Sequence, residues 1–154
     1  MDRRPGKATA KGADRELKAL KLEGRILPGS GKAQHYVSIP GYRRQFEEKL
    51  GFSPFPGTLN VHLYPSSMVH REELDRRQAI IIQGFVQGEH VYGSSRCYPA
   101  RISGVSAAVV IPERTHYPSD VIEVLAPAKL REVLGLSDGD RVTILISCPS
   151  KSGD

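Results

Sequence analysis

Residues 54–63 read PFPGTLNVHL, and this stretch carries the clearest strand signal of the 154-residue chain. Its proline and glycine residues predict a turn. From residue 58 to residue 63, polar and apolar side chains then alternate strictly, which is the period of a β-strand with two different faces. Alternation places Leu59, Val61 and Leu63 on one face and Thr58, Asn60 and His62 on the other. We therefore predict a strand with one apolar face and one consecutive polar face.

Outward from this strand, the chain reads as a series of short strands separated by turn signals. The further strands that we predict cover residues 22–27, 35–39, 79–85, 90–92, 96–102, 105–111, 121–125 and 141–146. Residues 64–77 are polar and rich in turn-forming residues. No regular alternation of strands with helices is present, and this favours a closed antiparallel barrel over a parallel sheet.

Two short helices are predicted between the strands. In the first, apolar side chains recur at every fourth position between Tyr42 and Leu50, and Gly51 is placed to end the helix. The second covers residues 127–134, with a proline at its first position and Gly135 just beyond its end. The sequence therefore indicates a mainly β protein with two brief helices.

The positive charge of the chain is concentrated at its N-terminus. The formal net charge is +5, and residues 1–21 contribute +4 of it through seven basic and three acidic side chains. We predict a basic flexible leader over residues 1–21, one folded domain over residues 22–148 and a flexible C-terminal tail over residues 149–154. A nucleic-acid-binding arm is the alternative interpretation of the leader.

Several classes of protein find no support in the sequence. The two cysteines, Cys97 and Cys148, form no CxxC pair, so neither a zinc knuckle nor a disulfide framework is indicated. The motifs HExxH and GxSxG, which mark metalloproteases and α/β-hydrolases, do not occur. The chain also has no apolar run long enough to span a bilayer and no secretory signal, so we expect a cytoplasmic protein without a membrane partner.

The polar face of the strand at residues 58–63 offers oxygen ligands for a metal ion. Thr58 and Asn60 lie two positions apart, at a Cα separation of about 6.5–7 Å, so that a hydroxyl and an amide oxygen can converge on one hard cation. A strand with a solvent-facing polar side is the plainer alternative. Glu123 lies in an apolar strand, where its carboxylate must either face water or find hydrogen-bond donors.

Two further segments can approach an anion. The loop at residues 28–31 contains two glycines, which allow backbone N–H groups to surround a phosphate, although an ordinary hairpin loop explains it equally. It is not a P-loop, because Ser30 stands where that motif requires lysine. Residues 126–131 open the second predicted helix and carry Lys129 and Arg131, yet a plain amphipathic helix has the same pattern.

Three motifs, taken in order, resemble the archaeal CTP-dependent riboflavin kinases. Residues 50–60, LGFSPFPGTLN, are similar to that family's LGFxPxxGTLN signature. Residues 112–117, PERTHY, and residues 121–131, VIEVLAPAKLR, follow it. The resemblance covers residues 22–147. It implies a six-stranded Greek-key barrel of the cradle-loop, riboflavin-kinase-like type.

The resemblance also implies an activity and a set of site residues. The activity is transfer of the γ-phosphate of CTP to the ribityl 5′-hydroxyl of riboflavin, which gives FMN and CDP, with one Mg²⁺ ion bridging the nucleotide phosphates. The nucleotide-binding residues implied are Arg25, Ile26, Leu27, Pro28, Gly29, Ser30, Ala128, Lys129, Leu130 and Arg131. The flavin-binding residues implied are Thr115 and Glu123, and the metal ligands are Thr58 and Asn60. No catalytic base is assigned.

The first loop departs from the family pattern. Residues 29–34 read GSGKAQ, whereas the family often has an additional glycine near Ala33. We expect Lys32 to supply positive charge there in place of a closer backbone approach to the phosphate.

A DNA-binding regulator with a swapped-hairpin barrel of the AbrB type is the alternative function. The basic leader and the helix-turn-strand pattern of residues 130–144, with its SDGD turn, suggest it. However, the leader is too short for the winged helix that some riboflavin kinases carry, and the rest of the chain lacks the charge excess of a phosphate-binding face. We therefore expect riboflavin, FMN, CTP and CDP as ligands and no nucleic acid. A monomer is plausible, and the oligomeric state stays open.

Overall fold

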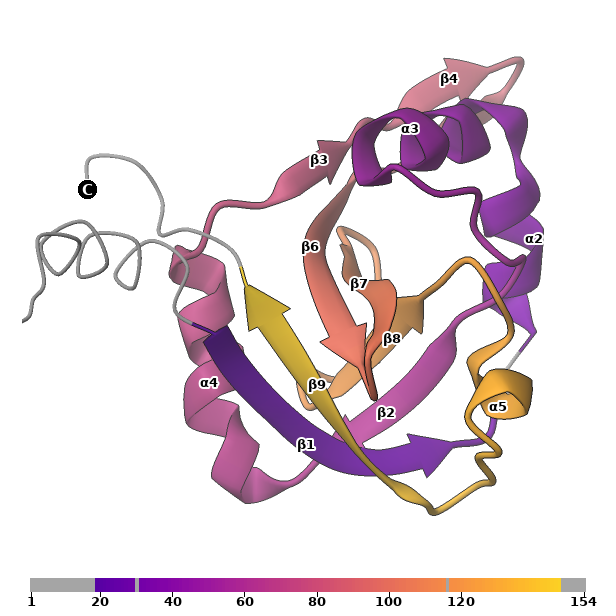
Figure 1. Cartoon of the computed structure of the whole chain (residues 1–154). Coiled ribbons are helices and arrows are strands. Elements are labelled where there is room, and N and C mark those ends of the chain that lie inside the picture. Colours follow the sequence, from indigo (N-terminus) through magenta and orange to yellow (C-terminus); the bar gives the residue numbers. More distant parts are fainter. Residues whose placement is uncertain (1–18, 30, 116, 148–154) are drawn as a thin grey trace, which may run out of the picture.

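The structure, a computed structural model, describes residues 19–29, 31–115 and 117–147 (Figure 1). Residues 1–18 of the predicted leader and residues 148–154 lie outside the described residues. The first strand begins at Ala19, three positions before the predicted start of the domain, and Leu20 is already buried.

Six antiparallel strands close into a barrel, as the sequence predicts (Figure 1). They pair in the order β6-β7-β8-β2-β1-β9, and β9 pairs back onto β6 to close the ring. The six strands are β1 (Ala19–Leu27), β2 (Leu59–Leu63), β6 (Ser95–Ile102), β7 (Val105–Pro112), β8 (Val121–Leu125) and β9 (Arg141–Ser147). Because β6, β7 and β8 are successive neighbours and β2 lies beside β8, the connectivity is that of a Greek key.

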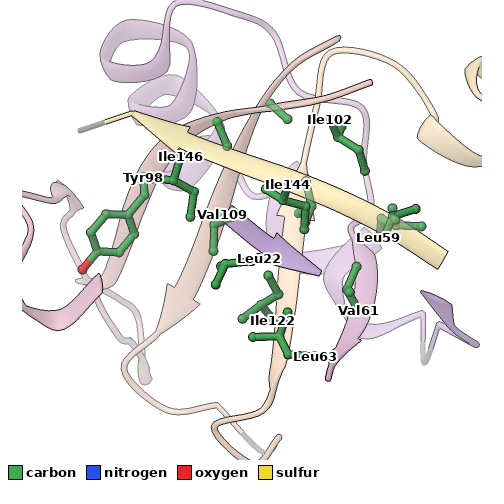
Figure 2. Close-up of a cluster of buried hydrophobic side chains, with 14 of the residues drawn as sticks. Leu22, Leu59, Val61, Leu63, Tyr98, Ile102, Val109, Ile122, Ile144 and Ile146 are labelled. Carbon is green, nitrogen blue, oxygen red and sulfur yellow. The ribbon is translucent and has the colours of Figure 1, made fainter. Parts of the chain in front are cut away.

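Apolar side chains fill the barrel interior (Figure 2). The residues labelled there are Leu22, Leu59, Val61, Leu63, Tyr98, Ile102, Val109, Ile122, Ile144 and Ile146. A second buried cluster lies on the outer side of the wall, where α3 (Pro40–Leu50) packs its Tyr42 and Phe46 with Ile82, Val110 and Leu125. Consequently β7 and β8 are buried on both faces along much of their length.

The helical segment before β2 is longer than predicted. Of residues 35–39, predicted as a strand, residues 35–38 belong instead to α2 (Lys32–Ser38), which follows Gly31 in the left-handed conformation at φ 81°, and Ile39 is the extended residue that ends this helix. The prediction was wrong because a run of only five residues does not distinguish the helical period from the strand period. In the helix, Val37 is buried in the outer cluster. The first predicted helix is confirmed as α3 (Pro40–Leu50), which starts two residues early because Pro40 fits its first turn.

Two other predicted segments differ from the structure. The turn-rich residues 64–77 form η1 (Pro65–Ser67), α4 (Met68–Glu73) and η2 (Leu74–Arg76), short helices that a mostly polar sequence did not reveal. The second predicted helix, residues 127–134, is reduced to the single turn α5 (Leu130–Val133), and its predicted start at Pro127 is wrong. Before α5, Pro127 and Ala128 form a bend and Lys129 is extended, and the carbonyl of Ala126 accepts a hydrogen bond from the Phe55 amide at 2.8 Å.

The predicted strand at residues 79–85 is divided in two. β3 (Ile80–Ile82) pairs with β6 and extends the barrel sheet, whereas β4 (Phe85–Gln87) pairs with β5 (His90–Tyr92) in a separate hairpin. The division falls next to Gly84, where any Cβ would collide with the carbonyl oxygen of Tyr92. Of the helices in the described part of the chain, none has both the length and the apolar character needed to cross a membrane.

Candidate functional site

Strands β2 and β8 form the wall on which the candidate site is built. Asn60 and Glu123 are register partners in this antiparallel pair. Their neighbours along the chain belong to the interior cluster, and these are Leu59, Val61, Ile122 and Val124. Alternation therefore turns Asn60 and Glu123 to the outer side of the barrel. Both remain buried there, with exposed fractions of 4% and 6%.

A cavity of about 590 Å³ lies against this part of the wall. Its lining residues are Tyr42 and residues from five segments, within residues 29–36, 55–60, 92–95, 112–117 and 123–131. The volume falls in the range of sites that bind small molecules and cofactors. The cavity thus brings together loops that are up to about one hundred residues apart in the sequence.

A polar network connects the side chains at the base of the cavity. The Oγ1 atom of Thr58 lies 3.1 Å from Oε1 of Glu123 and 3.1 Å from Oδ1 of Asn60. Asn60 in turn donates from Nδ2 to the hydroxyl of Tyr117 at 3.0 Å. Since a threonine hydroxyl has one proton, Thr58 can donate to only one of its two acceptors at a time.

The carboxylate of Glu123 also has a donor from the helical side of the cavity. The Tyr36 hydroxyl lies 3.3 Å from Oε1 of Glu123. Burial raises the pKa of the Tyr36 phenol well above its ordinary value, and the nearby negative charge of Glu123 raises it further. Tyr36 therefore stays neutral and keeps its proton for the carboxylate at physiological pH.

Aromatic rings form one side of the cavity. Tyr36 packs edge-on against Tyr42 with ring centroids 6.1 Å apart, and Tyr42 packs in the same way against Tyr92 at 5.8 Å. Tyr42 is fixed by a 2.6 Å hydrogen bond from its hydroxyl to the Gly93 carbonyl. Burial raises the pKa of Tyr42 as well. The result is an apolar wall facing the polar network.

Most of the predicted site residues reach the cavity. Its lining includes the predicted metal ligands Thr58 and Asn60, the predicted flavin contacts Thr115 and Glu123, and the predicted nucleotide contacts Gly29, Ala128, Lys129, Leu130 and Arg131. The strand pairing of β2 with β8 and the loop before α5 bring these distant motifs together.

The start of the first nucleotide-binding motif lies away from the cavity lining. The Arg25 guanidinium sits 6.0 Å from the ring of Tyr64, and Ile26 is buried in the barrel core. Leu27 and Pro28 precede the lining residue Gly29. Ser30 lies outside the described residues.

Arg131 connects two loops at the edge of the cavity. One of its terminal nitrogens donates to the Leu27 carbonyl at 2.8 Å and forms an ion pair with Asp138 at 2.6 Å. Lys129, two residues earlier, has a longer and more exposed ion pair with Glu132 at 3.7 Å. Arg131 therefore ties the end of β1 to the turn before β9, and Lys129 has the looser attachment.

Sequence reasoning did not nominate the tyrosines of the site. Tyr36 lies in the segment predicted as a strand, so the sequence did not predict that it stands on a helix with its hydroxyl next to Glu123. Tyr117 ends the PERTHY motif, and only its place in that motif marked it. Both become visible once the pairing of β2 with β8 is known.

Thr58 and Asn60 have the chemistry of a site for a hard cation. Their side-chain oxygens are 3.1 Å apart and border the cavity, and Mg²⁺ is commonly held by few protein oxygens together with substrate phosphates and water. The described residues contain no group of three or more His, Cys, Asp or Glu side chains placed to hold a metal ion. This pair of oxygens therefore fits an ion that a nucleotide would bring with it.

Comparison with known proteins identifies the family. Residues 26–146 match the family model CTP-dep_RFKase, described as a domain of unknown function, DUF120. The chain is 57% identical over 129 residues to the riboflavin kinase of Methanosarcina barkeri, which covers 84% of this chain and 57% of that protein. It is 46% identical over 125 residues to the riboflavin kinase of Archaeoglobus fulgidus, covering 81% of this chain and 54% of that protein.

A third relative, the riboflavin kinase of Methanosarcina acetivorans, is 51% identical over 138 residues, covering 90% of this chain. The chain spans less than two thirds of the length of these relatives, 58% in the last case. The family match at residues 26–146 nevertheless includes every residue that lines the cavity. The chain belongs to the CTP-dependent riboflavin kinase family.

Proposed function

We propose that the chain transfers the γ-phosphate of CTP to the ribityl 5′-hydroxyl of riboflavin and releases FMN and CDP. One observation carries the proposal: a single cavity collects the oxygens of Thr58 and Asn60, the carboxylate of Glu123 and the basic segment at residues 128–131. The named relatives are riboflavin kinases. The family match over residues 26–146 includes Thr58, Asn60, Glu123 and the segment at residues 128–131.

In this proposal the two substrates occupy opposite parts of the cavity. The nucleotide lies along Gly29 and residues 128–131, where Gly29 permits close backbone approach and Lys129 supplies positive charge. The flavin lies towards Thr115 and Glu123, beside the aromatic wall of Tyr36, Tyr42 and Tyr92. Thr58 and Asn60 sit between the two parts, where the phosphate is transferred.

A magnesium ion fits the proposal and would be held by Thr58 and Asn60. When bound, it would neutralise negative charge on the nucleotide phosphates, which is the main requirement of phosphoryl transfer. Residue side chains supply the remaining needs, namely alignment of the substrates and exclusion of water.

The proposed reaction forms one bond and breaks another. The ribityl 5′-oxygen bonds to the γ-phosphorus, the bond from that phosphorus to the β–γ bridging oxygen breaks, and CDP departs with the electron pair. The hydroxyl proton is released to water. Glu123 orients the flavin through its buried carboxylate. Flavin binding alone accounts for its position, so no catalytic base is assigned.

The structure offers little for the DNA-binding alternative. Residues 22–154 carry fifteen basic and fourteen acidic side chains, a net charge of +1. In the SDGD turn, Asp138 is paired with Arg131 and Asp140 accepts a hydrogen bond from the Ser137 amide at 2.8 Å. These acidic groups stabilise the turn, and phosphate contacts would need the opposite charge.

A direct assay tests the proposal. Purified protein is incubated with riboflavin, magnesium and one nucleotide at a time from ATP, CTP, GTP and UTP, and FMN is measured by chromatography. We expect FMN with CTP and far less with the other three nucleotides. No FMN with any nucleotide, or equal rates with ATP and CTP, would contradict the proposal.

A further inference from the structure

We infer that Tyr36 is a positioning residue, whose hydroxyl holds the carboxylate of Glu123 in the orientation that binds riboflavin. The inference rests on the proposed function, because it concerns the flavin part of the same cavity. It adds a residue from α2, a segment outside the three motifs that mark the family in this sequence.

The contact lies at the end of a buried side chain that requires donors. An ionised carboxylate only accepts hydrogen bonds, and burying one without donors is costly. Oε1 of Glu123 accepts hydrogen bonds from two hydroxyl groups. One is that of Thr58, which directly precedes β2, at 3.1 Å, and the other is that of Tyr36 in α2, at 3.3 Å. The two donors approach from different elements, so together they restrict rotation of the carboxylate.

The Tyr36 ring is held in place independently of its hydroxyl. It packs edge-on against Tyr42, and its neighbour Val37 is fully buried in the outer cluster. The bond from Tyr42 to the Gly93 carbonyl then anchors this pair of rings to the loop after β5. Removing the Tyr36 hydroxyl should therefore leave the ring where it is and free only the carboxylate.

The length of the contact is consistent with a positioning role. At 3.3 Å it is longer than the usual distance between two oxygens in a hydrogen bond, which is about 2.7–2.8 Å. Hydrogen bonds weaken as they lengthen, so a contact of this length contributes little to the stability of the protein by itself. A donor that tightens with bound flavin would affect flavin binding more than stability of the free protein.

A double-mutant cycle on riboflavin affinity tests the inference. Wild type, Tyr36→Phe, Glu123→Gln and the double variant are titrated with riboflavin by fluorescence quenching without nucleotide, and KM for CTP and Tm are measured in parallel. Tyr98→Phe is the matched control, because it removes a buried phenol hydroxyl inside the barrel, away from the cavity.

We expect Tyr36→Phe to weaken riboflavin binding about five- to tenfold, in keeping with the loss of a hydrogen bond to a charged group. In the Glu123→Gln background the same change should have less than about a twofold effect, because the carboxylate through which Tyr36 acts is gone. KM for CTP should not change, and Tyr98→Phe should leave riboflavin affinity at the wild-type value.

Each contrary result has a distinct meaning. If wild type binds no riboflavin, the proposed function and this inference both fail. If wild type binds riboflavin and Tyr36→Phe binds it equally well, only the inference is overturned. Equal losses in both backgrounds would also overturn it, since Tyr36 would then act on the ligand or on the fold without Glu123. A loss of affinity that is matched by Tyr98→Phe would show a general effect of stability.

Discussion

Asn60 illustrates how one residue can serve both the fold and the site. Its backbone pairs β2 with β1 and β8, and its side chain lies on the outer face of the wall, within the polar network. The amide is buried, its oxygen lies 3.1 Å from the Thr58 hydroxyl, and its nitrogen donates to the Tyr117 hydroxyl. Replacing Asn60 therefore affects the site and removes one polar contact from each of two hydroxyl groups, those of Thr58 and Tyr117.

Asn60→Leu should lower kcat on the order of 100-fold, about 3 kcal/mol of transition-state stabilisation, if its oxygen helps to neutralise charge during phosphate transfer. Riboflavin affinity without nucleotide should barely change. Because the change removes the hydrogen bond to the Tyr117 hydroxyl and the contact with the Thr58 hydroxyl, we also expect a loss of about 1–3 kcal/mol in the free energy of unfolding. Steady-state kinetics over a magnesium titration, with thermal melting, provide the measurement.

His62→Leu is the control for that substitution, since His62 lies two residues further along the same strand face but is exposed and paired with Asp120. It should leave kcat at the wild-type value. Full activity of a folded Asn60→Leu protein would remove Asn60 from the site.

The raised pKa of Tyr36 gives a pH dependence with a definite sign. The folded pKa lies well above the ordinary value of 10.0, so the folded state retains a proton that the unfolded state loses. Stability from this group is fully present below pH 10 and falls as pH rises from 10 towards the folded pKa. Subtracting the phenolate absorbance of Tyr36→Phe from that of wild type should therefore give a titration curve above pH 10.

In a Glu123→Gln protein the same difference curve should move to lower pH, because the carboxylate charge no longer opposes ionisation. Burial, the larger cause, would still keep it above the ordinary range. A curve centred on the value of a free tyrosine would show that Tyr36 is solvated.

At the scale of elements, α5 is held by its contacts more than by its own length. It is a single helical turn, and the Arg131 side chain connects it to the end of β1 and to Asp138. This arrangement places the predicted nucleotide-binding residues 128–131 next to the loop that contains Gly29. Arg131 thus connects the segment at residues 128–131 with the loop that follows β1.

Asp138→Asn should raise KM for CTP by up to about fivefold, because a partly exposed ion pair of this kind contributes about 1 kcal/mol or less. Riboflavin affinity should stay the same, since the flavin residues lie on other elements. Glu132→Gln serves as the comparison, because its pair with Lys129 is longer and its side chain is 75% exposed. An equal change in KM for both variants would mean that only the overall charge matters.

The whole molecule shows which features local sequence patterns can predict. Local patterning identified β2, β8 and β9 closely, because β2 and β9 have a period of two and β8 is a short, mostly apolar run. It did not identify α2, where the residues around Tyr36 fit either period over so short a run. It also did not decide whether Glu123 faces solvent, because that depends on which strand lies beside β8 and on what covers the outer face.

The predicted site followed the same division. The oxygens of Thr58 and Asn60 could be paired from their spacing, whereas their meeting with Glu123 depends on a register between residues more than sixty positions apart. The roles assigned by family resemblance stay predictions for every site residue, and one of them, Ile26, packs in the core. Physical proximity is the information that local patterns lack.

Truncation at the N-terminus tests the domain boundary. Removing residues 1–18, which carry +3 of the net charge, should leave Tm and the yield of FMN nearly unchanged, because β1 begins at Ala19. Removing residues 1–22 also deletes the buried Leu20 and Leu22 and should cost about 3 kcal/mol or more. The two truncations are compared by thermal melting and by the FMN assay, and a large loss in the shorter deletion would assign the leader to the enzyme.

The burial of β8 on both faces determines where the protein can be altered. From Ile122 to Leu125 every residue is buried, in the interior, at the cavity or in the outer cluster, whereas β9 alternates and presents Leu145 at 44% exposure. Random mutagenesis should therefore recover few functional variants in β8 and many on the outer face of β9. A fluorophore or crosslinker attached through Leu145→Cys would report on the barrel without entering the cavity, which makes β9 the natural place for a labelling handle.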